Sequence, residues 1–364
     1  MPVVPRRDLE SLPKYIPGRT VRGAIKLASN EISDGPLPSV VETISRLTPT
    51  VNRYPDGDSQ VLRERLVRDL DVDVAQIAIG CGSVALLQQL VQALCSPGDE
   101  VLFAWRSFES YPIVTQVAHA VSVTVPLSEG HGLDLDAMLA GITPRTKMIF
   151  ICNPNNPTGT AVYRDELARF IDAVPENVLV VLDEAYKEFV TDANVPDGVQ
   201  FVRARSNVAV LRTFSKAYGL AGLRIGYAIA SEVVCEALRQ VCITFSVNAI
   251  AQVAAIASLD AGDEMFERCR SITVERDRVR DSLIAMGYEV PPSQANFVWL
   301  PLAQRATVFT DYMLDRKLIV RPFVGEGIRV TVGAAEENDL FLAAAREFLG
   351  VARPLSVKSC ASIE

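Results

Sequence analysis

Histidine is scarce in this chain: its 364 residues include only His119 and His131. Neither lies beside another candidate ligand in the sequence, so we expect no histidine-based catalytic triad and no metal site. Seven cysteines are present, an odd number, and none forms a CxxC pair. Such a set is typical of reduced thiols in a cytoplasmic protein.

Long apolar runs are also missing. The most apolar stretch, NAIAQVAAIASL, is shorter than the roughly 20 residues that a membrane-spanning helix needs. The first residues, MPVVPRRDLE, lack the apolar core of a secretion signal. The formal net charge of −8 disfavours nucleic acid and anionic membrane surfaces as partners. We therefore expect a cytoplasmic protein that binds neither nucleic acid nor membrane.

The chain is long enough for two domains. Its 364 residues exceed the length that a single hydrophobic core usually supports. Apolar residues make up 49% of the chain, which is ordinary for a globular protein. The first residues are rich in proline and show little periodicity. We expect an N-terminal arm (1–28), a large domain (29–250), a smaller C-terminal domain (251–353) and a flexible tail (354–364).

Apolar strands and helical stretches alternate through the large domain. The strands QIAIGCGS, KMIFIC, NVLVVLDEAY and NVAVLRTFSK are separated by helical patterns, which predicts a mostly parallel α/β sheet with helices on both faces. Ser83 is expected to cap the helix SVALLQQLVQALC. Beyond residue 250, long helical patterns alternate with the short strands ANFVWL, LIVRPF and GIRVTVG. That change predicts an α+β second domain.

Unusual polar residues follow several of these strands, where ligands of open α/β sheets bind. The GCGS turn (80–83) leads into a helix N-terminus, which favours an anion such as phosphate, although a plain capped helix has the same pattern. NPNNPTG (153–159) predicts a rigid loop that presents amides, although a stiff turn is the plainer interpretation. Asp183 ends an apolar strand, where a buried acid needs a cation or a hydrogen-bond donor.

The least ordinary run is TFSKAYGLAGLRIGY (213–227). Lys216 stands at a strand end among apolar residues, where desolvation and neighbouring cations can lower the pKa of an amine and make it nucleophilic. Thr213, Ser215 and Arg224 add two hydroxyls and a guanidinium, a set suited to a phosphate dianion. A surface lysine is the ordinary alternative. An amine, an acid, an amide, a phenol and a phosphate cradle together fit pyridoxal phosphate.

The chain resembles the fold-type-I pyridoxal-phosphate aminotransferases of the histidinol-phosphate aminotransferase family. The motifs that carry the resemblance span nearly the whole chain: KLASNE, NRYPDG, NPNNPTG, DEAY, TFSKAYGLAGLRIGY, SQANFVWL and IRVTVG. CGSVALLQQL and WRSFESYP are more similar to the actinobacterial branch of aromatic (phenylalanine) aminotransferases. The resemblance implies a mostly parallel central sheet with helices on both faces and a smaller α+β C-terminal domain. It also implies a homodimer whose substrates are small molecules, namely an amino acid and a 2-oxo acid.

The resemblance also implies roles around the cofactor. Lys216 would bind pyridoxal phosphate as a Schiff base and move the Cα proton of the substrate. Asp183 would keep the pyridine nitrogen protonated. Asn156 and Tyr186 would hydrogen-bond the phenolic oxygen. Phe108 would stack on the pyridine ring, without the hydroxyl of the tyrosine that many relatives have there.

The phosphate and the substrate would be bound by further residues. The resemblance assigns the phosphate to Gly82, Ser83, Thr213, Ser215 and Arg224. Tyr54, in NRYPDG, would reach the phosphate of the neighbouring subunit, which implies a homodimer with shared sites. Arg329 would bind the α-carboxylate of the substrate, with Arg321 as a second cation. Three residues lie in motifs near the substrate, although capping or turn roles fit them equally well: Tyr15, Asn30 and Asn296.

We expect transamination of phenylalanine, tyrosine and tryptophan with a 2-oxo acid such as 2-oxoglutarate. Histidinol phosphate is the alternative donor, because the paired arginines could hold a phosphate instead of a carboxylate; similarity to the aromatic branch favours the first. A related decarboxylase would use the same cofactor residues. A non-catalytic regulatory domain is disfavoured, because the catalytic set is intact and no basic DNA-binding segment is appended. The cis or trans state of the Asn-Pro bonds is left open.

Overall fold

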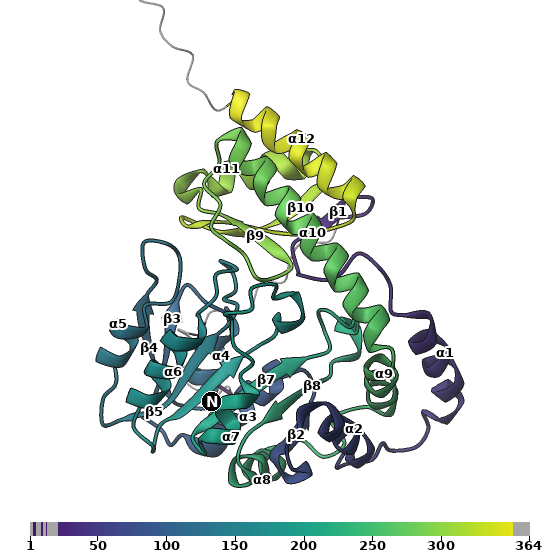
Figure 1. Cartoon of the computed structure of the whole chain (residues 1–364), viewed down its shortest axis with the longest axis vertical. Helices are drawn as coiled ribbons and strands as arrows, with labels where there is room; N and C mark the ends of the chain where they lie inside the picture. The colour runs from purple at the N-terminus through teal and green to yellow at the C-terminus, as the bar shows by residue number, and fades with distance from the viewer. Residues whose placement is uncertain (1–2, 5–8, 10–11, 13–20, 352–364) are drawn as a thin grey trace, which may run out of the picture.

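The computed structural model describes residues 3–4, 9, 12 and 21–351, and these form two β-sheets, each covered by helices (Figure 1). Most of the expected arm and the whole of the expected tail lie outside the described residues, as does Tyr15. The bounds of the four expected segments stay predictions.

The larger sheet has seven strands in the order β2-β8-β7-β6-β5-β3-β4. Neighbours in this sheet are parallel, except that β8 is antiparallel to both β7 and β2. Because β8 reverses direction on both sides, β2 runs the same way as β7, and the carboxyl ends of the parallel strands share one edge. The expected mostly parallel sheet is confirmed. In sheet order, the strands are β2 (Ile77–Gly80), β8 (Gly226–Ile229), β7 (Val208–Thr213), β6 (Leu179–Asp183), β5 (Thr146–Cys152), β3 (Glu100–Trp105) and β4 (Val121–Pro126).

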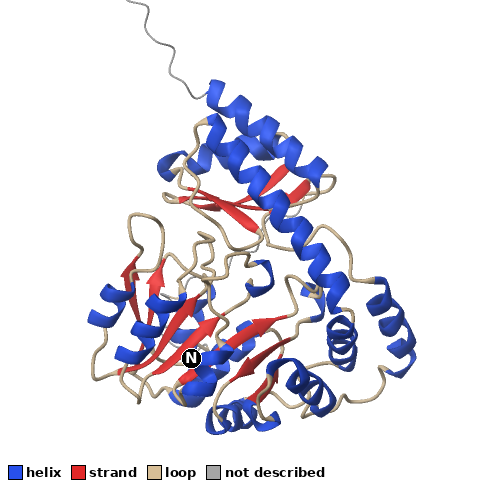
Figure 2. Cartoon of the chain, viewed as in Figure 1, coloured by secondary structure: helices blue, strands red, loops and turns tan. Residues whose placement is uncertain are grey.

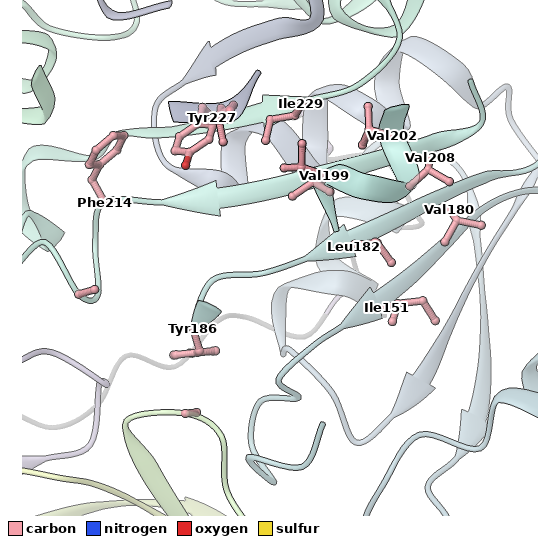
Figure 3. Packing of buried hydrophobic residues seen from close by; sticks show 14 of the residues in the cluster. Ile151, Val180, Leu182, Tyr186, Val199, Val202, Val208, Phe214, Tyr227 and Ile229 are labelled. Atoms are coloured by element: carbon pink, nitrogen blue, oxygen red, sulfur yellow. The ribbon is translucent and has the colours of Figure 1, made fainter. Parts of the chain in front are cut away.

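Helices cover both faces of this sheet (Figure 2), because alternate residues of its strands point to opposite sides and nearly all are apolar. Ile149 and Ile151 of β5 pack in one buried cluster, together with Val180 and Leu182 of β6 (Figure 3). Phe150 lies in the cluster on the other face. The first cluster contains residues of α2 (Gln60–Leu70), α5 (Leu135–Ala140), α6 (Arg164–Ala173), α7 (Val199–Ala204) and α9 (Ala249–Asp260). The second contains residues of α3 (Ser83–Leu94), α4 (Ser110–Val117) and α8 (Glu232–Val241).

The smaller sheet has four strands in the order β1-β10-β11-β9. The elements that build this part are β1 (Ile25–Leu27), β9 (Phe297–Leu300), β10 (Leu318–Phe323), β11 (Gly327–Thr331), α10 (Gly262–Met286), α11 (Ala306–Asp315) and α12 (Ala335–Val351). In Figure 1, α10 runs from the smaller sheet down to α9 and so connects the parts of the chain that surround the two sheets. The helix α1 (Pro38–Leu47) packs against α9.

Strand β1 brings the N-terminal segment into the smaller sheet. It pairs in parallel with β10, and Leu27 is buried in the core of that sheet. A strand of three residues is too short to show a periodic pattern, so the sequence did not indicate this pairing. The consequence is that the residues directly after β1 are held beside the edge of the larger sheet where its strands end.

The expectation that Ser83 caps α3 is wrong. Gly82 precedes the helix with a φ of 79°, Ser83 is already its first residue, and no side chain caps this N-terminus. The glycine turns the chain so that Ser83 enters the helix.

Both Asn-Pro bonds of the NPNNPTG loop, Asn153–Pro154 and Asn156–Pro157, are cis. Within the described part of the chain, no helix is long and apolar enough to cross a membrane.

Candidate active site

A cavity of about 250 Å³ opens where the strands of the larger sheet end. The loops after β1, β2, β3, β5, β6 and β7 form its walls, and β11 of the smaller sheet closes it. It brings together most of the residues singled out in the sequence, namely Asn30, Ser83, Phe108, Asn156, Asp183, Tyr186, Thr213, Ser215, Lys216, Arg224 and Arg329. A larger cavity of about 720 Å³ lies among α2, α7, α9 and α10 and contains none of these residues. We therefore place the candidate active site in the smaller cavity.

Lys216 lies in this cavity, three residues after the end of β7. Its Nζ donates a hydrogen bond to the Ser29 carbonyl at 3.0 Å. Desolvation, followed by the positive charge of Arg329, lowers the pKa of the amine to about 7. A considerable fraction of the amine is therefore neutral at neutral pH, which is the form that acts as a nucleophile or a base.

Asp183, the last residue of β6, is buried at the floor of the cavity. Its Oδ2 accepts a hydrogen bond from the Tyr111 hydroxyl at 2.9 Å. Its Oδ1 is buried and makes no hydrogen bond of standard geometry with any described residue. Burial raises the pKa of this carboxyl to about 6, against the opposing effects of Tyr111 and the Ala185 amide. A buried acceptor with a free lone pair suits a ligand that presents an N–H group.

Sequence reasoning missed Tyr111. It lies in the first turn of α4, three residues after Phe108, and the two rings meet edge to face with centroids 5.6 Å apart. Burial and the nearby charge of Asp183 raise the pKa of Tyr111 well above its usual value, so its hydroxyl stays protonated and donates. Tyr111 and Phe108 are joined by a turn, in which the Tyr111 amide donates to the Phe108 carbonyl at 3.0 Å.

An anion cradle lies at the N-terminus of α3. Ser215 Oγ accepts hydrogen bonds from Thr213 Oγ1 at 3.0 Å and from Arg224 Nη1 at 3.2 Å. Gly82 lies against the same guanidinium, and a Cβ added to Gly82 would clash with it. Ser83, the first residue of α3, lines the cavity beside them. Hydroxyls, a guanidinium and a helix N-terminus thus converge, which is an arrangement suited to a phosphate.

An amide and a phenol also line the cavity. Asn156 Oδ1 accepts a hydrogen bond from Arg329 Nη1, and the Tyr186 hydroxyl accepts one from Asn30 Nδ2 at 2.8 Å. Burial raises the pKa of Tyr186, so its phenol is neutral. Asn296 does not line the cavity: it is buried behind it and donates to the Asn30 carbonyl at 3.2 Å.

Arg321 and Arg329 come from neighbouring strands of the smaller sheet. They lie directly opposite each other in the β10–β11 pair. Arg329 lines the cavity, whereas Arg321 lies behind the wall and donates to Glu109 Oε2 at 2.6 Å. Glu109 does line the cavity, beside Phe108. Its contact with Arg321 joins residues from the two sheets, and sequence reasoning gave no sign of it.

Tyr54 does not line the cavity of its own chain. It is 82% exposed and stacks on Phe245, with ring centroids 4.6 Å apart. Two further apolar residues, Val51 and Ile243, are exposed in the same two segments. An exposed aromatic pair with apolar neighbours is typical of a surface that another chain covers.

Comparisons with known proteins cover nearly the whole chain. Residues 22–345 match the family described as aminotransferase class I and II. The chain is 56% identical over 338 residues to an aromatic amino acid aminotransferase of Rhodococcus jostii, covering 93% of this chain and 94% of that protein. It is 56% identical over 347 residues to a protein of the same name from Streptomyces coelicolor, covering 94% and 97%. The crystal structure of histidinol-phosphate aminotransferase from Sinorhizobium meliloti, in complex with pyridoxal-5'-phosphate, superposes with a TM-score of 0.87 at 30% identity, covering 95% of this chain and 97% of that one.

Proposed function

The chain belongs to the class I and II aminotransferase family, and on this basis we propose that it transfers the amino group of phenylalanine, tyrosine or tryptophan to a 2-oxo acid such as 2-oxoglutarate. One observation carries the choice of substrate: the chain is 56% identical, over 93% of its length, to an enzyme named for aromatic amino acids. The histidinol-phosphate aminotransferase with a similar fold is 30% identical, so the alternative donor has less support.

Pyridoxal phosphate is the cofactor, and the described residues fit it. The free lone pair of Asp183 Oδ1 suits the protonated ring nitrogen. The cradle around Arg224 suits the phosphate, and the Lys216 amine suits the aldehyde. When bound, pyridoxal phosphate supplies a ring that delocalises the negative charge of a deprotonated substrate carbon.

We assign the proton transfer to Lys216. Its partly neutral amine can bind the aldehyde carbon of the cofactor. Lys216 would hold the cofactor through its aldehyde, and its Nζ would act as the base that accepts the Cα proton of the amino donor. In the structure, the hydrogen bond that Nζ donates to the Ser29 carbonyl keeps the amine within the cavity.

Four residues would orient the cofactor ring. Asp183 would accept a hydrogen bond from the ring N–H and, as a buried carboxylate, keep that proton in place. Asn156 and Tyr186 would hydrogen-bond the phenolic oxygen, and Phe108 would cover one face of the ring. These contacts would hold the ring in one orientation relative to the substrate.

The phosphate would be held by Gly82, Ser83, Thr213, Ser215 and Arg224. The exposure of Tyr54, together with its stacking on Phe245, supports a homodimer in which Tyr54 reaches the phosphate site of the neighbouring subunit. Such an arrangement would make each site depend on both chains.

Arg329 would bind the α-carboxylate of the substrate, since its guanidinium lines the cavity. Asn30 lines the cavity as well. The Asn296 side-chain amide donates to the backbone carbonyl of Asn30, so we assign Asn296 a supporting role. Arg321 and Tyr15 complete the proposed substrate set.

All six cysteines among the described residues are free thiols, which supports a cytoplasmic location.

A donor panel tests the substrate assignment. The holoenzyme is incubated with 2-oxoglutarate and phenylalanine, tyrosine, tryptophan or histidinol phosphate, and the oxo product is quantified. We expect kcat/KM for the aromatic donors to exceed that for histidinol phosphate by about tenfold or more. A preference for histidinol phosphate would overturn the choice of donor. Release of carbon dioxide without an oxo acid would instead identify a decarboxylase.

A further inference from the structure

The two oxygens of the Asp183 carboxyl group have different surroundings. Oδ2 accepts a hydrogen bond from the Tyr111 hydroxyl at 2.9 Å, whereas Oδ1 is buried and makes no hydrogen bond of standard geometry with any described residue. Asp183 lines the cavity, and Tyr111 does not. Because a hydrogen bond from outside the cavity occupies one oxygen, the carboxyl group can turn little, and its other oxygen is left for a ligand.

Tyr111 is closely packed. It lies in the first turn of α4 and is fully buried. The centroid of its ring lies 4.8 Å from that of Phe150 and 5.6 Å from those of Phe103 and Phe108. Three aromatic rings around a buried phenol leave its hydroxyl little freedom to move. The donor to Asp183 is therefore fixed in position.

Tyr111 also contacts the residue proposed to cover the cofactor ring. The Tyr111 amide donates to the Phe108 carbonyl at 3.0 Å, the two rings meet edge to face, and Phe108 lines the cavity. Phe108 is assigned to the face of the cofactor ring, and Asp183 is assigned to its nitrogen. Both of these residues meet Tyr111, so Tyr111 fixes them relative to each other.

The charged form of Asp183 depends on hydrogen bonding. Burial raises the pKa of this carboxyl to about 6. The Tyr111 hydroxyl is the strongest influence in the opposite direction, followed by the Ala185 amide. Glu184 adds a small repulsion, and it is itself paired with Arg212 at 2.8 Å. Removing the hydroxyl would leave a buried carboxylate without its main donor, which is costly.

Two further titratable groups lie near Asp183. Cys152 is directly opposite Asp183 in the β5–β6 pair, and Tyr186 follows three residues later in the chain. Burial raises the pKa of both groups above its usual value, so both are neutral. Neither adds a charge that could replace the hydrogen bond from Tyr111.

We propose that Tyr111 is a positioning residue for transamination: its hydroxyl occupies Oδ2 of Asp183 and stabilises the carboxylate, so that Oδ1 holds the proton on the ring nitrogen of the cofactor. The inference rests on the proposed role of Asp183 and is independent of which amino donor is used. A protonated ring delocalises the negative charge of the substrate carbon better than a neutral one. Loss of the hydroxyl should consequently slow the chemistry and leave substrate binding intact.

The state of the ring nitrogen gives a direct test. The holoenzyme is prepared with pyridoxal phosphate whose ring nitrogen is isotope-labelled, and nitrogen NMR reports whether that atom carries a proton. Tyr111→Phe keeps the packed ring and removes the hydroxyl. We expect the shift of a protonated nitrogen in the wild type, that of a neutral nitrogen in Asp183→Asn, and an intermediate shift in Tyr111→Phe. A shift in Tyr111→Phe equal to that of the wild type would overturn the proposal.

Turnover gives a second readout. In Tyr111→Phe we expect kcat for phenylalanine to fall by about tenfold and KM to change by about twofold or less. The matched control is Tyr288→Phe, which removes another buried hydroxyl. That hydroxyl donates to the Ala345 carbonyl at 2.7 Å, and Tyr288 does not line the cavity. Tyr288→Phe should match the wild type in both readouts, and equal losses in the two variants would contradict the proposal.

A double variant tests whether Tyr111 acts through Asp183. Tyr111→Phe/Asp183→Asn should turn over within about twofold of the rate of Asp183→Asn alone, because the charge that the hydroxyl stabilises is already gone. A further loss of about tenfold would show a separate role and refute the proposal. This comparison remains decisive if Tyr111→Phe does not fold, since the double variant has no buried carboxylate deprived of its donor.

The outcomes also distinguish this inference from the proposed function. If Asp183→Asn keeps a protonated ring nitrogen, the proposed role of Asp183 fails, and that of Tyr111 fails with it. If Asp183→Asn loses the proton and Tyr111→Phe behaves as the wild type, only the role of Tyr111 fails. The NMR measurement needs no amino donor. A holoenzyme that acts on no aromatic donor would therefore refute the proposed substrate and leave the result for Tyr111 unaffected.

Discussion

The Lys216 amine differs from an ordinary lysine in its protonation near neutral pH. Desolvation and the charges of Arg329 and Arg224 favour the neutral form, and Glu31 opposes them. The result is a pKa of about 7, against 10.5 for an unperturbed lysine. The chemistry of the site depends on this shift, because only the neutral amine attacks an aldehyde.

We predict that covalent attachment of pyridoxal phosphate to the cofactor-free protein depends on pH in a way that reports this pKa. With a pKa of about 7, the neutral fraction of Lys216 reaches one half at about pH 7 and is nearly complete about one pH unit above it. The attachment rate, followed by stopped-flow absorbance, should therefore rise and level off just above that pH. A rate that keeps rising toward pH 10 would show an ordinary lysine. Lys216→Ala should show neither covalent attachment nor turnover.

Asp183 is predicted to matter for rate more than for cofactor binding. Asp183→Asn removes the charge that holds a proton on the ring nitrogen, while most cofactor contacts persist. We expect turnover of phenylalanine to fall by about a hundredfold or more, as when other preorganised electrostatic groups are removed. The bound cofactor, measured by its absorbance, should fall much less. Asp172→Asn, at an exposed salt bridge with Arg205, should have wild-type activity; equal turnover in the two variants would refute the role of Asp183.

At the scale of elements, the turn between β2 and α3 is specialised for close approach of an anion. Gly82 has a φ of +79°, and a Cβ there would clash with the Arg224 guanidinium. Glycine is required at this position for two reasons, the backbone conformation and the space. A larger residue would push the guanidinium out of the cradle that Ser215 completes.

Gly82→Ala should therefore weaken cofactor binding. We expect the dissociation constant of pyridoxal phosphate, measured by fluorescence titration, to rise by about tenfold or more, because the displaced Arg224 loses a charge-assisted contact. The control is Gly98→Ala, where φ is +91° and no atom lies within 4 Å of an added Cβ. That variant should lose about 1 kcal/mol of stability from backbone strain and keep its cofactor affinity. Equal affinities in the two variants would contradict the cradle.

At the scale of the whole molecule, the cavity of one chain accounts for most of the proposed site but not for Tyr54. This residue is exposed in a stacked pair with Phe245. A homodimer would bury the pair and add a hydroxyl to the phosphate site of the neighbouring chain.

Subunit mixing tests that arrangement. Tyr54→Ala should lower cofactor affinity, and Lys216→Ala should be inactive. A hybrid dimer pairs one Tyr54→Ala chain with one Lys216→Ala chain. If sites are shared, one of its two sites combines the Lys216 of the first chain with the Tyr54 of the second, and that site is intact. Mixing the variants after dissociation should then yield more activity than either variant alone, and sedimentation should show a dimer. A monomer in solution, or no gain on mixing, would contradict shared sites.

The sequence alone determined the order and type of the main elements and the residues at the strand ends. Apolar runs with polar ends at Asp183, Asn156 and Lys216 are local patterns, and a parallel sheet must bring such ends to one edge. For that reason the fold class and most of the cavity wall could be predicted without coordinates. The cap expected at Ser83 was wrong because the backbone conformation of Gly82 moved the start of the helix by one residue.

Contacts between distant residues were decided only by the tertiary structure. Tyr111 reaches Asp183 across 72 positions, the Lys216 amine meets the Ser29 carbonyl across 187, and Glu109 pairs with Arg321 across 212. No local pattern specifies these contacts, because each depends on how separate elements and the two sheets pack together. The sequence thus identified the chemical groups of the site, and the packing determined which of these groups meet.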